Sequence, residues 1–578
     1  MRGATALADR RVVVLPLFAA LALAFTSPLW EHPQNLGHGD WLWYHFMWES
    51  ARKTLVDFHE LPLWNPFYCG GNVALANPAG VGLSPLHWPL LALPTAIAMK
   101  AHLTLMTFLG LWGAYELARA FFGRGPSAVL GACFFALAGT LGWHMNGQTQ
   151  MASMELLPWA ILFARRASAR WPFALAAGAV LATQFLAGAV YPLVITSVAV
   201  ALDGLGGLAS DRAARARSLA GYALAFASAP AYAAIKVLPV VDFLRDHRRP
   251  IASDDAIGWR VLVDAFFVRR GTSDQIWSHE GYAYAWWGEY GNYLGVLGVL
   301  VALAALALGG RLRREAVLLL VALALVAGDH GAWSPYALLR KLPLVGNLRV
   351  PTRYWAVFDL WLACLVARGA WRGARLATLR LPRGVALPSL AFASAVSALA
   401  IADLVRTNGR LVFRDAMPTA PAPPDEHRRD FRQVVGAPWR MWMYPPRGEG
   451  TLRCFDELTI AISPALRAGL PSEAYLADPT AGSVAITSWA PSTWRLHVTA
   501  ARDATVVVNQ NAYRGWVADG FRVGAREGLV AFDVPAGERE VVLRYVPPGY
   551  RAGLAITLGS LAVTAGLLVW RMRRRSEG

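Results

Sequence analysis

The stretch that decides the fold runs from Arg11 to Trp30, RVVVLPLFAALALAFTSPLW, and is followed at 35–45 by NLGHGDWLWYH. The first run is almost wholly apolar and is long enough to cross the hydrocarbon core of a bilayer as a helix. It lacks a clean small-residue cleavage site, so we interpret it as a retained first span rather than a signal peptide. Asp40 then lies just beyond the far end of that span, at the water boundary. An acid there is either a solvated loop residue or part of a site.

Apolar runs of this kind recur along most of the chain. Of its 578 residues, 56% are hydrophobic and only 16% are charged, whereas soluble proteins carry about 25% charged residues. The sequence therefore predicts a polytopic α-helical membrane protein with about twelve transmembrane helices. We expect these spans near 11–29, 98–121, 126–143, 151–167, 172–189, 191–205, 217–241, 291–309, 314–328, 353–370, 385–404 and 551–571.

The net charge of +17 is distributed as membrane topology requires. Arginines cluster in alternate loops, at 119–124, 165–170, 212–217, 311–314 and 368–383, while the loops WHMNGQTQ and GAVYP between them hold none. This alternation follows the positive-inside rule and predicts that both termini are cytoplasmic. The basic charge thus indicates orientation in the membrane, and we expect no nucleic-acid partner.

Three parts of the chain differ in composition. Residues 1–404 predict a multi-span domain with large outer loops at 30–97 and 242–290. Residues 405–550 predict an extracytoplasmic domain, because a proline-rich linker is followed by short alternating segments such as TWRLHVTA that are typical of a β-sandwich. Residues 551–578 predict the last transmembrane helix and a basic cytoplasmic tail. Cys69 and Cys454 both fall in outer segments, where a disulfide between them is possible.

The first outer loop gathers polar and aromatic side chains around Asp40. In a helix that begins there, Asp40 and Tyr44 share one face, while Trp41 and His45 line the neighbouring face. Asp is also a favoured N-cap, so Asp40 has a purely structural alternative role that is compatible with a catalytic one. Downstream, the dense glycines and prolines from Trp64 onward predict an irregular backbone, which near lipid must line a cavity or be buried in protein.

Other candidates lie at the same outer level. Glu155 falls near a membrane boundary, where an acid is a functional candidate by default, the alternative being a packed acid hydrogen-bonded to a neighbouring helix. Arg349 and Arg353 lie where the chain re-enters the membrane, and Arg245 follows a predicted span. Guanidinium groups at a bilayer edge bind phosphates through forked hydrogen bonds, although they also bind lipid headgroups generally.

These motifs, taken in order, resemble the YfhO-type bacterial membrane proteins of the wider GT-C group of glycosyltransferases, which use polyprenyl-phosphate sugars. The resemblance covers nearly the whole chain and implies an active site on the extracytoplasmic face with Asp40 as the key acid. The usual pattern has a second polar residue where this chain has Trp41. Acid pairs that bind metal in some members have no clear counterpart, so we expect no metal and no cofactor. The matching pieces are GHGDWLWYH, LPLWNPFYCGGN, NGQTQMASMELLPW, VLPVVDFLRDHRR, GEYGNYLGVLGV, PLVGNLRVPTRYW and the closing segment from NQNAYRGW to PPGYRAG.

The resemblance implies inverting sugar transfer from a polyprenyl-phosphate-linked donor to a cell-envelope glycan, lipid or polymer, in the bacterial inner membrane among its lipids. Asp40 would act as general base or orient the acceptor. The alternatives are a lipid or glycan transporter or flippase, which should hold ionisable groups near the bilayer midplane, and a non-catalytic envelope assembly protein. Arg349, Arg353 and Arg245 are expected to hold the donor phosphate, and the residues expected to contact acceptor or sugar are Trp41, Tyr44, His45, Trp64, Asn65, His144, Gln148 and Glu155.

Overall fold

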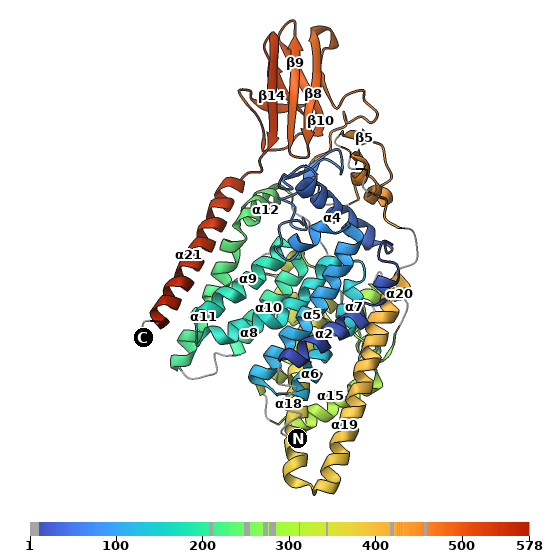
Figure 1. Cartoon of the computed structure of the whole chain (residues 1–578), viewed down its shortest axis with the longest axis vertical. Helices are drawn as coiled ribbons and strands as arrows, with labels where there is room; N and C mark the ends of the chain where they lie inside the picture. The colour runs from blue at the N-terminus through green and yellow to red at the C-terminus, as the bar shows by residue number, and fades with distance from the viewer. Residues whose placement is uncertain are drawn as a thin grey trace.

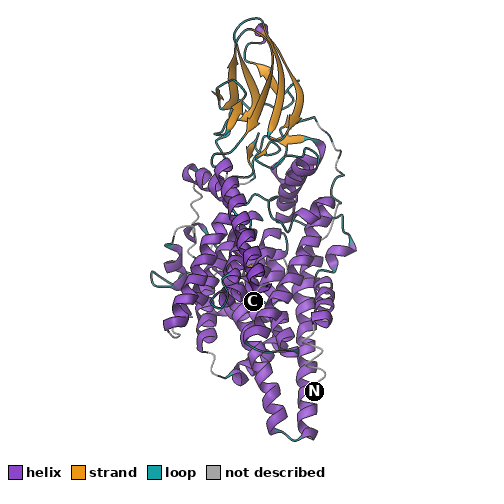
Figure 2. Cartoon of the chain, turned by 60° about the vertical axis from the view of Figure 1, so that its left-hand side comes forward, coloured by secondary structure: helices purple, strands orange, loops and turns teal. Residues whose placement is uncertain are grey.

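The chain forms a helical body with a β domain at one end. The structure, a computed structural model, shows the strands gathered above the helices in Figures 1 and 2. The C-terminal helix returns from the β domain along the flank of the body (Figure 1). The described residues are 11–206, 212–247, 255–269, 275–276, 285–310, 313–342, 345–416, 421–424, 426, 428, 430–455 and 459–576.

The first half of the helical body carries the outer loop that begins after the first predicted span. A two-residue hairpin, β1 (Trp64–Asn65) with β2 (Asn72–Val73), forms within that loop. The helices are α2 (Arg11–Phe25), α3 (Pro28–Glu31), α4 (Asp40–Val56), η1 (Trp88–Ala92), α5 (Thr95–Phe121), α6 (Pro126–Ala136), α7 (Gly139–Met145), η2 (Thr149–Leu156), α8 (Leu157–Ala167), α9 (Pro172–Leu186), α10 (Val190–Gly206), α11 (Arg212–Tyr232) and α12 (Ala234–Asp246).

The second half of the body ends in a long hairpin of two helices at the end remote from the β domain (Figure 1). The second helix of this hairpin continues beyond residue 404 through a π-helical turn, so the expected domain boundary at 404/405 falls inside one helical run. The helices are α13 (Trp259–Phe267), α14 (Trp287–Tyr290), α15 (Gly295–Gly309), α16 (Arg313–Ala327), α17 (Pro335–Arg340), η4 (Val345–Asn347), η5 (Pro351–Tyr354), α18 (Trp355–Arg380), α19 (Arg383–Leu404), η6 (Val405–Leu411), α20 (Val412–Ala416) and, after the β domain, α21 (Tyr550–Ser576).

The helices coincide with the apolar runs of the sequence, but several are short or bent. Within the described residues, three helical segments are long and apolar enough to cross a membrane: 288–309, 383–415 and 550–574. Counting the bent pairs α6–α7, with an angle of 44°, and α11–α12, with an angle of 80°, as one span each raises the number to five. The expected number of about twelve spans therefore stays a prediction.

The β domain consists of two four-stranded antiparallel sheets, as the alternating pattern predicted. One sheet has the order β12–β13–β10–β7 and the other β11–β14–β9–β8. Buried and less buried residues alternate along β9, as expected for a strand with one face in a core. The inner faces of both sheets contribute to one hydrophobic cluster, so they pack as a sandwich. The strands are β7 (Ala474–Leu476), β8 (Gly482–Ala490), β9 (Thr493–Ala500), β10 (Ala504–Asn511), β11 (Trp516–Ala518), β12 (Val523–Arg526), β13 (Leu529–Val534) and β14 (Gly537–Tyr545).

The β domain is bonded to the loop between α3 and α5 by a disulfide and by hydrogen bonds, in addition to its connection along the chain. Cys69 and Cys454 form a disulfide, which settles the pairing that the sequence left open. The side-chain nitrogen of Asn511 donates to the carbonyls of Cys69 and Gly71 at 2.6 and 2.9 Å. A short parallel pair, β5 (Arg432–Val434) and β6 (Glu449–Thr451), lies in the segment that leads to Cys454. The loop and the sandwich thus form one unit.

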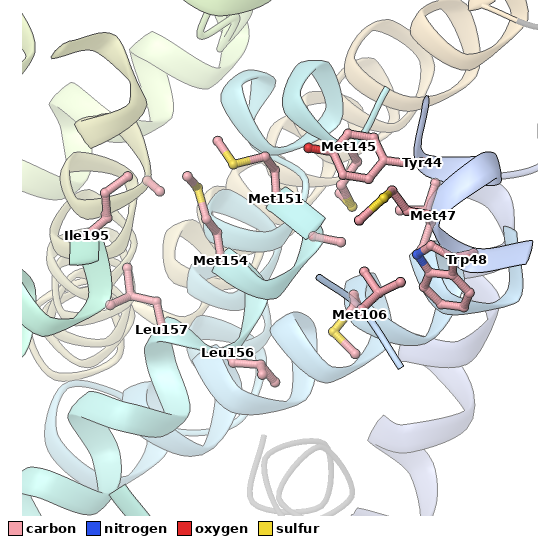
Figure 3. Close-up of a cluster of buried hydrophobic side chains, with 14 of the residues drawn as sticks. Tyr44, Met47, Trp48, Met106, Met145, Met151, Met154, Leu156, Leu157 and Ile195 are labelled. Carbon is pink, nitrogen blue, oxygen red and sulfur yellow. The ribbon is translucent and has the colours of Figure 1, made fainter. Parts of the chain in front are cut away.

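A methionine-rich part of the core lies beneath α4. Tyr44, Met47 and Trp48 of α4 face residues from α5, α7 and η2 in this region (Figure 3). The side chains are almost fully buried, and methionine adapts readily to irregular gaps between helices. The methionines concerned are Met47, Met106, Met145, Met151 and Met154.

Candidate functional site

The first turn of α4 presents Asp40 to an open surface. Gly39 precedes the helix at φ 59°, a conformation that glycine adopts without steric cost, and Asp40 is the first helical residue rather than the cap. This corrects the interpretation of Asp40 as an N-cap. Its carboxylate instead accepts a hydrogen bond at Oδ2 from Nε2 of Gln148, at 2.9 Å, and the residue is exposed to solvent.

The loop between α7 and η2 holds this turn of α4 in place. The indole nitrogen of Trp41 donates to Oδ1 of Asn146 at 3.0 Å. A Cβ added at Gly147 would lie 3.3 Å from the Cβ of Asp40, and one added at Gly37 would lie 2.3 Å from the Trp41 ring. Both glycines therefore allow close approach of the backbone. Trp41 itself is 2% exposed, so it positions Asp40 and does not offer a surface to a sugar.

An ion-paired group lies beside Asp40. Arg353, of η5, donates from Nε and Nη2 to the carboxylate of Glu289, of α14, at 2.9 and 2.5 Å. The Nε2 of His144 lies 3.0 Å from the same carboxylate, and its Nδ1 lies 2.7 Å from the carbonyl of Thr140. Three elements distant in sequence, α7, α14 and η5, therefore meet through one carboxylate.

Aromatic side chains flank the arginines. The guanidinium carbon of Arg353 lies 4.0 Å from the centre of the Tyr191 ring, a cation–π contact. The backbone N–H of Arg349 approaches the Tyr191 hydroxyl at 3.4 Å, and the Arg349 residue is exposed. Tyr44, one turn after Asp40 on α4, interacts with the charge of Arg353. Arg353 is thus already paired and packed, whereas Arg349 presents its side chain to solvent.

The electrostatic environment of Asp40 ties these groups together. The carboxylate reaches solvent, yet surrounding protein removes much of its hydration, and this raises the pKa of Asp40 above its usual value. The hydrogen bond from Gln148 opposes that rise, the charge of Glu289 adds to it, and Arg353 and Arg349 both lower the pKa. An accessible carboxylate with a raised pKa suits proton abstraction at neutral pH better than an ordinary aspartate does.

Several predicted site residues lie elsewhere. Trp64 is buried at the junction with the β domain, where it donates to Gln510 at 3.0 Å and packs on Trp516 and Tyr545. Its neighbour Asn65 is also buried, and its Oδ1 accepts from a backbone N–H two residues on. Both lie in the loop that joins the β domain. Neither forms a hydrogen bond with the Asp40 group, that is, Asp40, His144, Gln148, Glu289, Arg349 and Arg353.

His45, Glu155 and Arg245 also stand apart from the Asp40 group. Burial lowers the pKa of His45 to about 3, so its imidazole is neutral near pH 7. Glu155 is fully buried against Gly110, without a hydrogen-bond partner for either carboxylate oxygen among the described residues. Arg245 is exposed near the end of α12, and no hydrogen bond joins it to Asp40 within the described part of the chain.

The local sequence pattern did not identify Glu289 or Tyr191 as site residues. Glu289 belongs to GEYGNYLGVLGV and Tyr191 to the arginine-free loop GAVYP, so both stood in segments already placed at the outer level. A polar residue inside such a loop is the signal that could have identified them. Within the described residues, no three His, Cys, Asp or Glu side chains cluster as metal ligands.

Comparison with known proteins gives distant structural likenesses. No protein-family model matches the chain, and no curated protein sequence does either. The cryo-EM structure of the arabinofuranosyltransferase AftD from Mycobacteria has a TM-score of 0.43 and 16% identity over 70% of this chain. A mutant of AftD has a TM-score of 0.46 and 17% identity over 78% of this chain. The chain spans 27% and 33% of those two AftD chains.

A third likeness is to an enzyme from an archaeon. The crystal structure of the Archaeoglobus fulgidus oligosaccharyltransferase, complexed with Zn and sulfate, has a TM-score of 0.34 and 13% identity, covering 76% of this chain and 62% of that one. All three neighbours are glycosyl-transferring enzymes by name. Scores of this size carry no activity across, and membership of the YfhO-type proteins stays a prediction.

Proposed function

We propose that this chain is a GT-C-type membrane glycosyltransferase that moves a sugar from a polyprenyl-phosphate donor to an extracytoplasmic acceptor of the cell envelope. The observation that carries the proposal is that one exposed carboxylate, Asp40, lies close enough to the buried guanidinium of Arg353 and to the exposed Arg349 for both charges to lower its pKa. A base beside cations is the pairing that glycosyl transfer from a phosphate requires.

The proposed reaction uses these groups in defined roles. Gln148 occupies Oδ2 of Asp40, which leaves Oδ1 to accept the proton of an acceptor hydroxyl. The acceptor oxygen attacks the anomeric carbon as the bond from that carbon to the phosphate oxygen breaks. The electron pair passes to the phosphate, and the anomeric configuration inverts. Arg349 would stabilise the charge on the departing lipid phosphate.

Arg353 serves a positioning role in this proposal. Its guanidinium is bound in a forked pair to Glu289 and stacked on Tyr191, so its charge acts on Asp40 and the donor from a fixed place. The roles expected for Trp41 and Trp64 as sugar-stacking residues are not kept in the proposal, because both side chains are buried.

The proposed placement on the extracytoplasmic face in a bacterial inner membrane draws support from the disulfide. Cys69 lies in the first outer loop and Cys454 in the segment before the sandwich. Disulfides persist in oxidising compartments and are rare in the cytosol. The predicted orientation, with arginine-rich loops and both termini in the cytoplasm, places both cysteines outside.

The test is transfer by Asp40→Asn in the full chain, reconstituted with a panel of polyprenyl-phosphate sugars and envelope acceptors. We expect transfer to fall by about 10²–10⁴-fold, the usual contribution of a general base. Glu31→Gln is the matched control, because it makes the same change at an exposed acid of α3. Activity of Asp40→Asn equal to that of the control would refute the assignment.

A further inference from the structure

The short helix α13 leaves an apolar stripe uncovered on the outer part of the molecule. Trp259, Val263 and Phe267 are 68%, 45% and 43% exposed, and their spacing of four residues puts them on one side of the helix. Arg260 and Asp264 border this stripe, and the guanidinium carbon of Arg260 lies 5.6 Å from the Trp259 ring centre. A helix with apolar and charged sides at its surface is typical of a membrane–water interface.

The other side of α13 is docked firmly on the helical body. Phe266 packs on Trp355, of α18, with ring centres 5.1 Å apart, and Ala265 is 1% exposed. The carbonyls of Ala265 and Phe266 accept the backbone N–H groups of Asn292 and Leu294 at 3.1 and 3.0 Å. These contacts fix the orientation of the helix. The exposed stripe therefore belongs to an element that is packed against the helical body.

The position of α13 along the helical bundle follows from the helices that it contacts. It meets the first turns of α15 and α18, and Ile257, just before it, donates to the carbonyl of Ala327 at the end of α16 at 2.7 Å. These three helix termini lie at one end of the bundle. On α15, which α13 contacts, Val296, Leu300 and Leu303 are 63%, 55% and 57% exposed. The segment that contains them is long and apolar enough to span a membrane.

We propose that α13 is an interfacial helix that lies in the outer leaflet, with Trp259, Val263 and Phe267 inserted among lipid chains and Arg260 at the level of the headgroup phosphates. The occupant is the bilayer itself, because α13 packs on α15, whose exposed apolar side chains belong to a segment long and apolar enough to cross a membrane. Tryptophan and arginine are the residues that suit the boundary between chains and headgroups. The proposal does not depend on glycosyl transfer.

This placement links the membrane surface to the Asp40 group. Asn292, held by α13 through its backbone, donates from its side chain to Asp359 at 2.8 Å and accepts from the N–H of Thr140 at 3.1 Å. Glu289 lies three residues before Asn292 in the chain. The interfacial helix thus braces the segment that carries the carboxylate paired with Arg353.

The test places one environment-sensitive thiol label at a time on the full chain. Val263→Cys reports the stripe, Arg260→Cys is the matched control on the polar border, and Leu300→Cys is the lipid reference on α15. The native thiols Cys133 and Cys364 are buried and the other two cysteines are bonded, so the background is low. The labelled chains are placed in nanodiscs of phosphatidylethanolamine and phosphatidylglycerol, with nitroxide-bearing lipids or aqueous iodide as quenchers.

We expect the label at 263 to be quenched strongly by lipid nitroxides near the headgroups and several-fold less by iodide than the label at 260. The label at 300 should respond most to nitroxides deeper in the bilayer. If iodide quenches the label at 263 as strongly as the label at 260, the stripe lies in water and the proposal is overturned. A stripe that another protein covers in cells would give this same result, because the nanodiscs contain no such protein. Trp259→Cys repeats the measurement if the 263 variant fails to fold.

Discussion

Replacing Glu289 with glutamine should loosen the helical body far more than its partly exposed side chain suggests. Glu289 holds Arg353 through two hydrogen bonds and His144 through a third. The side chains of Arg353 and His144 are only 6% and 2% exposed. Glu289→Gln removes the charge and leaves the guanidinium buried without compensation.

Breaking a buried ion pair from one side costs about 3–5 kcal/mol. The Glu289 side chain is 21% exposed, so water can reach part of the pair and the lower end of that range applies. A loss of about 3 kcal/mol multiplies an opening equilibrium by about 150, since 1.36 kcal/mol corresponds to tenfold. Removing both charges, in Glu289→Leu with Arg353→Leu, leaves no unpaired ion and should recover most of this loss.

The chain contains its own reporters for this measurement. Cys364 lies on α18, the helix that begins two residues after Arg353, and is buried, as is Cys133 on α6, which packs against α18. A fluorogenic maleimide reacts with these thiols only when the helices open, and the labelling rate follows the opening equilibrium when reclosing is fast. We expect labelling on the order of 10²-fold faster in Glu289→Gln.

The exposed pair between Arg414 and Glu31 is the matched control. These side chains are 55% and 51% exposed, and such surface pairs contribute about 0–1 kcal/mol. Glu31→Gln should therefore label at nearly the parental rate. The reasoning fails if Glu289→Gln labels no faster than Glu31→Gln, or if the double leucine variant shows the sum of the two single losses rather than a recovery.

Three further outcomes follow from the same geometry. Because burial raises the pKa of Asp40, the rate of transfer should fall with decreasing pH through a midpoint above the ordinary aspartate pKa of about 3.9. Initial rates between about pH 3 and 8 measure this midpoint, and a value at or below about 3.9 contradicts the prediction. Arg349→Gln should raise the KM for a polyprenyl-phosphate donor about tenfold, because hydrogen bonds to charged groups contribute about 1.5–3 kcal/mol, and an unchanged KM in steady-state kinetics would remove Arg349 from the phosphate site. With Cys69 bonded to Cys454, thiol titration of the unfolded chain should find two free thiols before reduction and four after; four before reduction would place these segments in a reducing compartment.

The helical body and the sandwich were predictable because their patterns are local. Apolar runs bounded by arginines mark helices, and alternation in segments such as TWRLHVTA marks strands. The run past residue 404 was not predictable, since a buried Asn408 sustains it by donating to the carbonyls of Leu137 and Tyr293 at 2.8 and 3.0 Å. Contacts across such sequence separations leave no local pattern.

The candidate site shows the same division. Asp40 was identifiable because an acid directly beyond an apolar span is unusual. Glu289 was missed because its importance comes from pairings 145 and 64 residues away, with His144 and Arg353. Trp64 was assigned to sugar binding, yet an outer tryptophan serves equally in a membrane belt, a sugar site or a domain junction, and its partner Gln510 lies 446 residues away.

Two lysines, neither of which forms an ion pair within the described part of the chain, donate hydrogen bonds to the irregular loop that contains Asp40. The Nζ of Lys100 donates to the carbonyls of His32, Pro33 and Asn35 at 2.8, 2.9 and 2.7 Å. The Nζ of Lys236 donates to three other carbonyls, two of them in the outer loop, at 2.6–3.0 Å. An irregular backbone near lipid cannot satisfy its own carbonyls, so helix-borne ammonium groups do so.

Lys100→Met should therefore disturb the position of Asp40, although Lys100 does not itself bond to Asp40. The carbonyls of Pro33 and Asn35 lose their donor, at up to about 1–3 kcal/mol each, whereas the carbonyl of His32 still accepts from the N–H of Asn35; all three lie in the loop that leads into Asp40. Thiol labelling of the buried cysteines should accelerate, and transfer should fall with kcat affected more than KM for the donor, because the base loses its position while Arg349 keeps its own. Lys341→Met, at an exposed lysine, is the control. If Lys100→Met retains parental labelling and kcat, the loop is ordered by other contacts, and the β domain junction through Asn511 becomes the element that holds Asp40.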